Sequence, residues 1–186
     1  MIYVNKMHSQ NLEIVKFNIK LKKVQFDDLE LLRTWRNSDY VSKRMVVNEY
    51  ITSQMQEKWF SSINNDLNYH FIAEYNNEKV GVISIKNINN NSGEGAIYLA
   101  SEKYENTSVV PRIVLCFNDF IFDELKLDYI CSHVKRDNTK AIASTIAQGG
   151  KEDIEKSTPE FIYFRLYKES YFNKTKKIRQ ILNKIQ

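Results

Sequence analysis

The segment YICSHVKRDNTKAIASTIAQGG, residues 129–150, passes from a strand to a helix across a single short turn. Residues 129–135 are rich in the residue types that favour strands. Asn138 is placed to cap the following helix, because its side chain can accept a hydrogen bond from the first helical turn. That helix is expected to run to Gln148 and to stop at Gly149-Gly150. The segment therefore predicts a strand and a helix that pack against each other.

Upstream of this segment, the chain alternates between apolar and polar residues with a period of two. Tyr69 begins such an alternation, which reaches the Asn76-Asn77 pair, and asparagine pairs favour turns. A second run covers residues 79–85, and a third covers 95–100 after an Asn/Ser/Gly loop at 89–93. Three strands joined by short turns predict an antiparallel meander.

The first part of the chain predicts one strand and two helices. Residues 17–25 alternate as a strand, and Asp27 stands three residues before Glu30, as in a capping box. The helix that follows is expected to end near Arg36-Asn37. A second helix is expected from Ser53, with an apolar stripe formed by Met55, Trp59, Phe60 and Ile63.

A central helix is expected over residues 110–125. Pro111 fits its first turn, where the missing N–H costs nothing. A last long strand is expected at 161–167. The whole order is strand, two helices, three strands, helix, strand, helix, strand, which predicts a mixed α/β fold around one sheet. The apolar face of the central helix consists of Ile113, Val114, Phe117, Phe120 and Ile121.

The C-terminal segment, residues 173–186, predicts a basic amphipathic helix. Its hydrophobic stripe must be buried on the body of the protein or on a partner subunit, so a homodimer is one expectation. Its charged side is interpreted as a solvated face. The stripe is Ile178, Ile181, Leu182 and Ile185, and the cations are Lys174, Lys176, Lys177, Arg179 and Lys184.

Length and composition predict one globular domain over residues 1–186, with a net charge of +4. Apart from the C-terminal cations the body is nearly neutral, which argues against a nucleic-acid partner. The first residues carry no apolar signal sequence, no run is long enough to span a membrane, and Cys116 and Cys131 suit reduced thiols, so a cytoplasmic protein is expected. The three histidines lack ligand spacing, so no metal site is expected.

Residues 17–170 resemble the GNAT superfamily of N-acyltransferases. Lys135 to Ile142 is similar to the family's V-x-x-x-N-x-x-A-I segment, and residues 122–128 fit the connection that precedes it. Trp35-Arg36-Asn37 is similar to a W-R-N signature, and Val80 to Ile83 is similar to the family's third strand. The resemblance implies a central mixed sheet with flanking helices, to which this chain adds a C-terminal helix.

One segment departs from the family. The family binds pyrophosphate with a loop of the form Q/R-x-x-G-x-G/A, whose backbone N–H groups point at phosphate oxygens. The matching residues here, 105–110, contain no glycine. The resemblance implies cofactor binding through a modified loop, and loss of phosphate binding is the alternative.

The resemblance also implies where acyl-CoA binds. Pantetheine is expected to lie along residues 98–101 like an added strand, with the backbone N–H of Leu99 pointing at the thioester carbonyl. No metal takes part in this chemistry. The expected contacts to the cofactor are Tyr98, Leu99, Ala100, Asn106, Thr107, Ser108, Val109, Val110 and Asn138, and the expected contacts to the acceptor are Arg36, Asn37 and Tyr98.

Acyl transfer to an amine requires a base, and Glu94 is the candidate by its position before the fourth strand of the family. The alternative interpretation of Glu94 is an exposed loop acid. His133 is a second candidate base, and it is otherwise a satisfied core histidine. His70 is weaker still. Thr145 occupies the place where many family members have a tyrosine acid, and Ser144 and Tyr98 are weak substitutes.

The preferred function is transfer of an acyl group from acyl-CoA to the amine of a nucleotide-linked amino-dideoxy sugar, with dTDP or UDP as the nucleotide. Residues 35–99 most resemble enzymes of surface-glycan and flagellin-glycan pathways. One alternative is an acetyltransferase for protein N-termini or ribosomal proteins. A second is a degenerate GNAT domain that binds a partner without catalysis.

Overall fold

The computed structural model describes residues 3–5, 11–45 and 49–184. These residues form a nine-stranded sheet in the order β1-β2-β3-β4-β5-β6-β7-β9-β8, in which only the β6–β7 pair is parallel. The strands are β1 (Tyr3–Asn5), β2 (Glu13–Lys16), β3 (Ile19–Lys23), β4 (Tyr69–Tyr75), β5 (Glu78–Lys86), β6 (Ser92–Leu99), β7 (Tyr129–Lys135), β8 (Lys151–Glu152) and β9 (Phe161–Tyr167).

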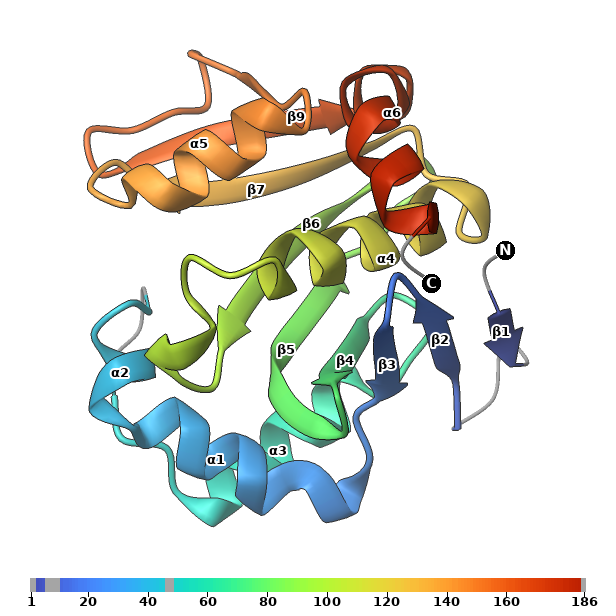
Figure 1. Ribbon diagram of the computed structural model, residues 1–186. Helices are drawn as coiled ribbons and strands as arrows, with labels where there is room; N and C mark the ends of the chain where they lie inside the picture. Colours follow the sequence, from blue (N-terminus) through green and yellow to red (C-terminus); the bar gives the residue numbers. More distant parts are fainter. Residues whose placement is uncertain (1–2, 6–10, 46–48, 185–186) are drawn as a thin grey trace.

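Helices cover both faces of this sheet (Figure 1). The helices are η1 (Phe26–Asp28), α1 (Leu29–Asn37), α2 (Asp39–Ser42), α3 (Ser53–Ile63), η2 (Glu102–Tyr104), α4 (Val109–Asp123), α5 (Thr139–Ala147) and α6 (Lys168–Lys184). The mixed α/β fold class with a central mixed sheet, flanking helices and an extra C-terminal helix is confirmed. Within the described ranges, no helix is long and apolar enough to cross a membrane.

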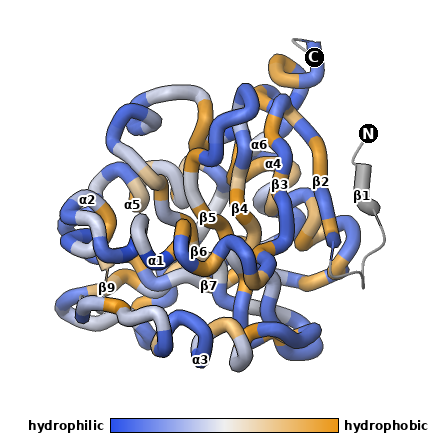
Figure 2. The backbone as a smooth tube through the Cα atoms, turned by 90° about the horizontal axis from the view of Figure 1, so that it is seen from below, coloured by the Kyte–Doolittle hydropathy of each residue, from blue (hydrophilic) through white to orange (hydrophobic). Residues whose placement is uncertain are grey.

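Three hydrophobic cores hold the helices to the sheet, and one of them packs α5 on Val134, Ile162 and Phe164 of β7 and β9. The larger core joins β2 to β5 with α4 and with Tyr171 and Leu182 of α6. A smaller core on the opposite face joins α1 and α3 to Ile72 and Val82. Figure 2 shows hydrophobic stretches in the strands, whereas α1 and α3 are mostly hydrophilic in colour. The sheet therefore has an α4 face and an α1/α3 face, and the latter carries the candidate acceptor site.

The local predictions around the meander and the central strand–turn–helix segment are confirmed. Asn76 and Asn77 both have positive φ, as a two-residue hairpin turn requires. β7 and β9 have the expected limits. Asn138 caps α5 by accepting a hydrogen bond from the N–H of Ala141 at 3.1 Å. Gly149 ends this helix with φ +98°, a conformation that favours glycine.

The strand expected over residues 17–25 is confirmed for Ile19–Lys23, which form β3, but it does not begin at Phe17. Phe17 and Asn18 have φ values of 56° and 58° and form a tight turn, so the segment belongs to a β2–β3 hairpin. Phe17 is completely buried in the larger core. Burial of this ring offsets the cost of placing a bulky residue in the left-handed region of φ and ψ. No pattern in the neighbouring sequence predicts this compensation.

The expected capping box at Asp27 and Glu30 is also displaced. The carboxylate of Asp28 instead accepts a hydrogen bond from the N–H of Gln25 at 3.1 Å, at the start of η1. Glu30 forms an ion pair with Arg33. In α3 the limits are as expected near Ser53, but Gln56 is buried and Met55 is exposed, so the predicted stripe holds only in part.

Helix α6 starts at Lys168, five residues before the expected helix. Its buried face is Tyr171, Thr175 and Leu182, whereas Ile178 and Ile181 are 37% and 57% exposed; Ile185 lies outside the described residues. The predicted stripe is therefore wrong for Ile178 and Ile181. A polar side chain with a hydrogen-bond partner, Thr175, takes part in the buried face instead. A homodimer remains a prediction.

The buried face of α6 is held by a charged cluster around Asp119 of α4. This carboxylate is completely buried and pairs with both Lys16 and Arg179. It also accepts a hydrogen bond from the hydroxyl of Tyr171 at 2.7 Å. Arg179 was expected on a solvated face and instead anchors the helix. The other four cations of the C-terminal segment, Lys174, Lys176, Lys177 and Lys184, are exposed as expected.

Candidate active site

Strands β6 and β7 pair over only three positions and then separate, which gives the sheet a fork. Ser92, Gly93 and Glu94 of β6 pair with Tyr129, Ile130 and Cys131 of β7. Beyond these pairs β6 continues to Leu99 with β5 on one side only. The other edge of β6 therefore presents backbone groups that a bound extended chain can pair with.

The backbone of Leu99 faces this open edge. The N–H of Ala100 donates to the carbonyl of Val80 at 2.9 Å, so Ala100 points toward β5. In an antiparallel ladder, successive residues direct their backbone groups to opposite sides. The N–H groups of Leu99 and, two residues earlier, Ile97 consequently point away from β5 and into the fork. This is the orientation that an oxyanion donor on β6 requires.

Glu94 and His133, the two candidate bases, lie together at the base of the fork. The Oε1 atom of Glu94 is 3.6 Å from Nδ1 of His133 and 3.1 Å from Nζ of Lys86. Their side chains share the α1/α3 face, because Glu94 is paired with Cys131 and His133 follows two residues later. Glu94 belongs to β6 rather than to a loop.

His133 is accessible to solvent, so its alternative interpretation as a core histidine is wrong. Its side chain is 45% exposed, and its ring meets Tyr163 edge-on at 4.9 Å between centroids. His70 has the reverse environment. It is buried beneath Trp59, and its Nε2 has no hydrogen-bond partner among the described residues. Burial, aided by Lys86, lowers the pKa of His70 to about 4. The structure thus places His133 in the fork and His70 in the interior.

Tyr98 lies on the same face of β6 as Glu94 and packs against the smaller core. Burial raises the pKa of its hydroxyl, and the nearby charge of Arg36 opposes this shift only partly. The phenol is therefore neutral at physiological pH and is a weak proton donor. Arg36 itself, in the last turn of α1, forms no ion pair with any other described residue.

Asn37 is used to hold the chain. Its Nδ2 donates to the carbonyl of Ile51 at 2.8 Å, and its Oδ1 accepts from the N–H of Ile51 at 2.8 Å. These two bonds fix the segment before α3 against the end of α1. Arg33 adds a contact from its guanidinium to the hydroxyl of Tyr50. Asn37 therefore ties the end of α1 to the segment before α3 through both polar atoms of its amide.

The loop expected to bind phosphate leads directly into α4. Asn106 has φ 58°, a conformation that asparagine tolerates in place of glycine. The hydroxyl of Thr107 accepts from the N–H of Val109 at 3.2 Å. Within the described chain, the N–H groups of Thr107, Ser108 and Val110 donate no hydrogen bond. Free N–H groups at the start of a 15-residue helix suit an anion.

Helix α5 offers little acid for the leaving group. The hydroxyl of Thr145 donates to the carbonyl of Ala141 at 2.8 Å within the helix. Ser144 accepts from the amide of Gln148 at 3.3 Å. The side chain of Asn138 is exposed at the head of the helix, where it caps through one atom only.

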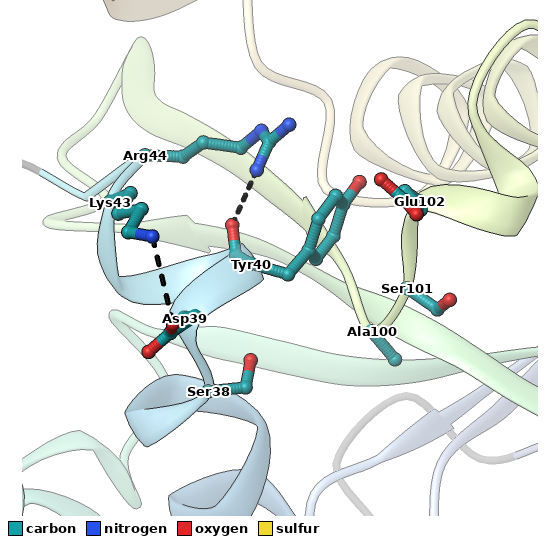
Figure 3. Close-up of a pocket in the computed structure, with 8 residues that line it drawn as sticks. All are labelled: Ser38, Asp39, Tyr40, Lys43, Arg44, Ala100, Ser101 and Glu102. Atoms are coloured by element: carbon teal, nitrogen blue, oxygen red, sulfur yellow. Dashed lines mark hydrogen bonds and ion pairs between the residues drawn. The ribbon is translucent and has the colours of Figure 1, made fainter.

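A hollow of about 430 Å³ lies beside the end of β6 (Figure 3). One wall is formed by residues 38–44 around α2, and the other by Ala100, Ser101 and Glu102. Tyr40 projects across it, and its ring stacks against the guanidinium of Arg44 at 4.1 Å.

The contacts that join this hollow to the phosphate loop were not predicted from the sequence. Tyr40, Arg44 and Lys140 all contact the carboxylate of Glu105. Lys86, beside Glu94, was also missed. Lys140 stands within the quoted motif, but nothing local indicates its partner, which is 35 residues away. Among the described residues, no group of three or more His, Cys, Asp or Glu side chains is arranged to hold a metal ion.

Comparison with protein families identifies the class. The model described as an acetyltransferase (GNAT) domain matches residues 18–149, so the chain belongs to the GNAT family of acetyltransferases, which use CoA to acylate amines. A search of curated proteins found no significant match.

Solved structures share the fold at low sequence identity. The spermidine N-acetyltransferase of Vibrio cholerae, in complex with CoA and spermine, is 19% identical with a TM-score of 0.74, and the match covers 85% of this chain and 100% of that one. The N-acetyltransferase PseH of Campylobacter jejuni, in complex with acetyl-CoA, is 18% identical with a TM-score of 0.62, covering 81% and 99%. The aminoglycoside acetyltransferase AAC(6')-Ib, in complex with CoA, is 15% identical with a TM-score of 0.71, covering 85% and 99%. The spermidine and aminoglycoside enzymes act on different acceptors, so the acceptor of this chain must be argued from the site.

Proposed function

We propose that this enzyme transfers an acyl group from acyl-CoA to the amine of a dTDP- or UDP-linked amino-dideoxy sugar. The observation that carries the proposal is Arg36. Its charge acts on the hydroxyl of Tyr98 from the last turn of α1, and it forms no ion pair with any described carboxylate. An unpaired guanidinium attracts a phosphate and repels a polycation such as a polyamine.

In the proposed complex, pantetheine lies along Tyr98, Leu99 and Ala100 and completes the open edge of β6. The phosphates of acyl-CoA lie at residues 106–110, where three free N–H groups begin α4. Asn138 faces pantetheine with the part of its amide that does not cap α5. Cofactor binding in this complex depends mainly on backbone groups, and Asn106 at φ 58° takes the left-handed conformation that a glycine would otherwise supply.

The acceptor amine loses its proton to Glu94 or His133, directly or through water, and its nitrogen then attacks the thioester carbonyl. A backbone N–H of β6 stabilises the oxyanion. Glu94 and Leu99 are five residues apart, about 16 Å along a strand that rises about 3.3 Å per residue. Ile97, about 10 Å from Glu94 at the same rise, is the nearer outward-facing donor. If Leu99 is the donor, the proton must reach Glu94 through more than one water.

Collapse of the tetrahedral species breaks the carbon–sulfur bond and releases the CoA thiolate. Thr145 is a poor proton source because its hydroxyl is already bonded within α5. The hydroxyl of Tyr98 is a weak acid. The thiolate therefore leaves unprotonated or takes its proton from solvent.

Thiol release from acetyl-CoA and longer acyl-CoAs tests the acceptor class. The panel contains dTDP- and UDP-linked amino sugars, N-terminal peptides, spermidine and an aminoglycoside. Turnover with a nucleotide-linked amino sugar at a kcat/KM well above all others is expected. Preference for a peptide, a polyamine or an aminoglycoside would reject the proposed acceptor.

Three variants test the assigned roles. Arg36→Gln is expected to raise the KM for the nucleotide-linked sugar by about 10-fold, since a charge-assisted contact is lost, while kcat stays similar. Glu94→Gln and His133→Gln separate the two candidate bases, and the true base is expected to lower kcat by about 10²-fold or more. Lys58→Gln on α3, an exposed cation without an ion-pair partner among the described residues, is the control for Arg36. Equal loss from Lys58→Gln would show an effect of charge alone.

A further inference from the structure

Glu105, at the head of the phosphate loop, is contacted by three donors from two other parts of the chain. Its Oε1 accepts from the hydroxyl of Tyr40 at 2.8 Å and from Arg44 at 3.2 Å, and its Oε2 accepts from Lys140 at 2.7 Å. Tyr40 belongs to α2, Arg44 follows it, and Lys140 lies in the first turn of α5. Three donors thus converge on one anionic group.

This cluster borders the hollow, and its side chains are partly exposed to solvent. Tyr40 and Arg44 line the hollow opposite Ala100 to Glu102 (Figure 3). The side chains of Arg44 and Lys140 are 50% and 63% exposed, and that of Glu105 is 22% exposed. Exposed ion pairs of this kind are weak, so a second anion can replace the carboxylate.

The donors around Glu105 suit an incoming anion with more acceptor atoms than a carboxylate. Two cations and one phenol hydroxyl contact this carboxylate, whereas Glu102 across the hollow is a second negative charge that acts on Tyr40. A phosphate group accepts more hydrogen bonds than a carboxylate, and arginine binds it with two parallel donors. The nearest loop has no glycine, so side-chain donors here would supplement the backbone N–H groups of residues 107–110.

We infer that Tyr40, Arg44 and Lys140 form a phosphate subsite, and that Glu105 is an internal competitor that occupies it until a phosphorylated ligand binds. The ligand chemistry is a phosphate ester or diphosphate. It has two sources, the diphosphate of acyl-CoA and the diphosphate of a nucleotide-linked acceptor. The second source rests on the proposed function, whereas the first rests on the CoA chemistry of the family.

Calorimetric titration of the full-length protein with CoA, pantetheine, UDP and dTDP tests this inference. Glu105→Gln is expected to lower the Kd for the relevant phosphate ligand by about 3- to 10-fold, because it removes the competing charge. Arg44→Gln and Lys140→Gln are expected to raise it by about 5- to 30-fold. Glu57→Gln on α3 and Lys176→Gln on α6, both exposed and outside the hollow, are the matched controls and should leave the Kd unchanged.

The probes separate the two sources. Shifts for CoA with none for pantetheine or the nucleotides assign the subsite to the cofactor, and shifts for UDP or dTDP alone assign it to the acceptor. The inference is overturned if Glu105→Gln tightens the binding of no phosphate probe, or if Glu57→Gln has the same effect. Acylation of nucleotide-linked sugars by the wild-type enzyme with no shift in these variants would reject the subsite and leave the proposed function intact.

Discussion

Asp119 and Glu105 have the same kinds of partners and opposite surroundings. Each carboxylate pairs with two cationic side chains and accepts a hydrogen bond from a tyrosine hydroxyl. Asp119 is fully buried between α4 and α6, whereas Glu105 lies at the edge of a hollow. Water cannot replace the partners of Asp119, but it can replace those of Glu105. Burial therefore makes the first cluster a structural anchor and the second an exchangeable contact.

Removal of the buried charge should have the largest effect. Asp119→Asn leaves Lys16 and Arg179 without a counter-charge inside the protein, and the free energy of unfolding is expected to fall by about 3–5 kcal/mol. Glu105→Gln should change it by less than about 1 kcal/mol. Urea denaturation followed by circular dichroism measures both.

Asp123→Asn, one turn further along α4, is the control for Asp119→Asn. Asp123 has no ion-pair partner among the described residues, so this variant should have nearly wild-type stability. Equal losses from Asp119→Asn and Glu105→Gln would contradict the assignment of anchor and exchangeable contact.

His70 and His133, the two described histidines on the α1/α3 face, offer a second comparison between a buried and an exposed side chain. Buried His70 has its pKa lowered from 6.5 to about 4, so the folded protein resists a proton that the unfolded chain accepts. Its contribution to stability is present above pH 6.5 and is lost as the pH falls toward 4, by up to about 3 kcal/mol. Unfolding of the His70→Phe variant should depend less steeply on pH in this window than unfolding of the wild type.

His133→Gln is the matched variant, because His133 is exposed in the fork. It should retain the wild-type pH dependence of unfolding between pH 4 and 6.5. An unchanged slope in His70→Phe would mean that His70 is protonated in the folded protein.

The free energies of unfolding of the Tyr171 and Tyr40 variants should differ by less than those of the Asp119 and Glu105 variants. The buried hydroxyl of Tyr171 donates to Asp119 at 2.7 Å, and Tyr171→Phe leaves a buried acceptor with one partner fewer, at a cost of about 1–2 kcal/mol. Tyr40→Phe should cost less than about 0.5 kcal/mol, because water can replace the hydroxyl at Glu105. Thermal unfolding of the two variants under identical conditions provides the measurement, and a larger loss in Tyr40→Phe would reverse the comparison.

The sequence predicts those parts of the fold whose signals are local. Asn76-Asn77 supplies its own turn chemistry, and Asn138 supplies its own cap. The Phe17 turn is stabilised by a core that the rest of the chain builds, so alternation alone placed the start of β3 two residues too early. Asp119 interrupts an apolar helix and is noticeable, but its partners lie 103 and 60 residues away.

The candidate site shows the same division between local and distant information. Glu94 and His133 were recognised as alternative bases, but their proximity depends on the β6–β7 pairing, which no local pattern specifies. The donors around Glu105 come from segments 35 to 65 residues distant along the chain. In the sequence nothing distinguishes these donors from other polar residues, because their contact with Glu105 arises only in the fold.

The smallest expected effect is the coupling between Glu105 and Lys140. A double-mutant cycle with Glu105→Gln and Lys140→Gln should give about 0.2–1 kcal/mol, and added salt should reduce it, because both side chains reach solvent. The corresponding cycle for Asp119 and Arg179 should give a larger value that responds less to salt. A weak coupling at Glu105 matters for function, because the carboxylate must leave its donors whenever a phosphate takes its place. A strong, salt-insensitive coupling there would instead make Glu105 a second structural anchor.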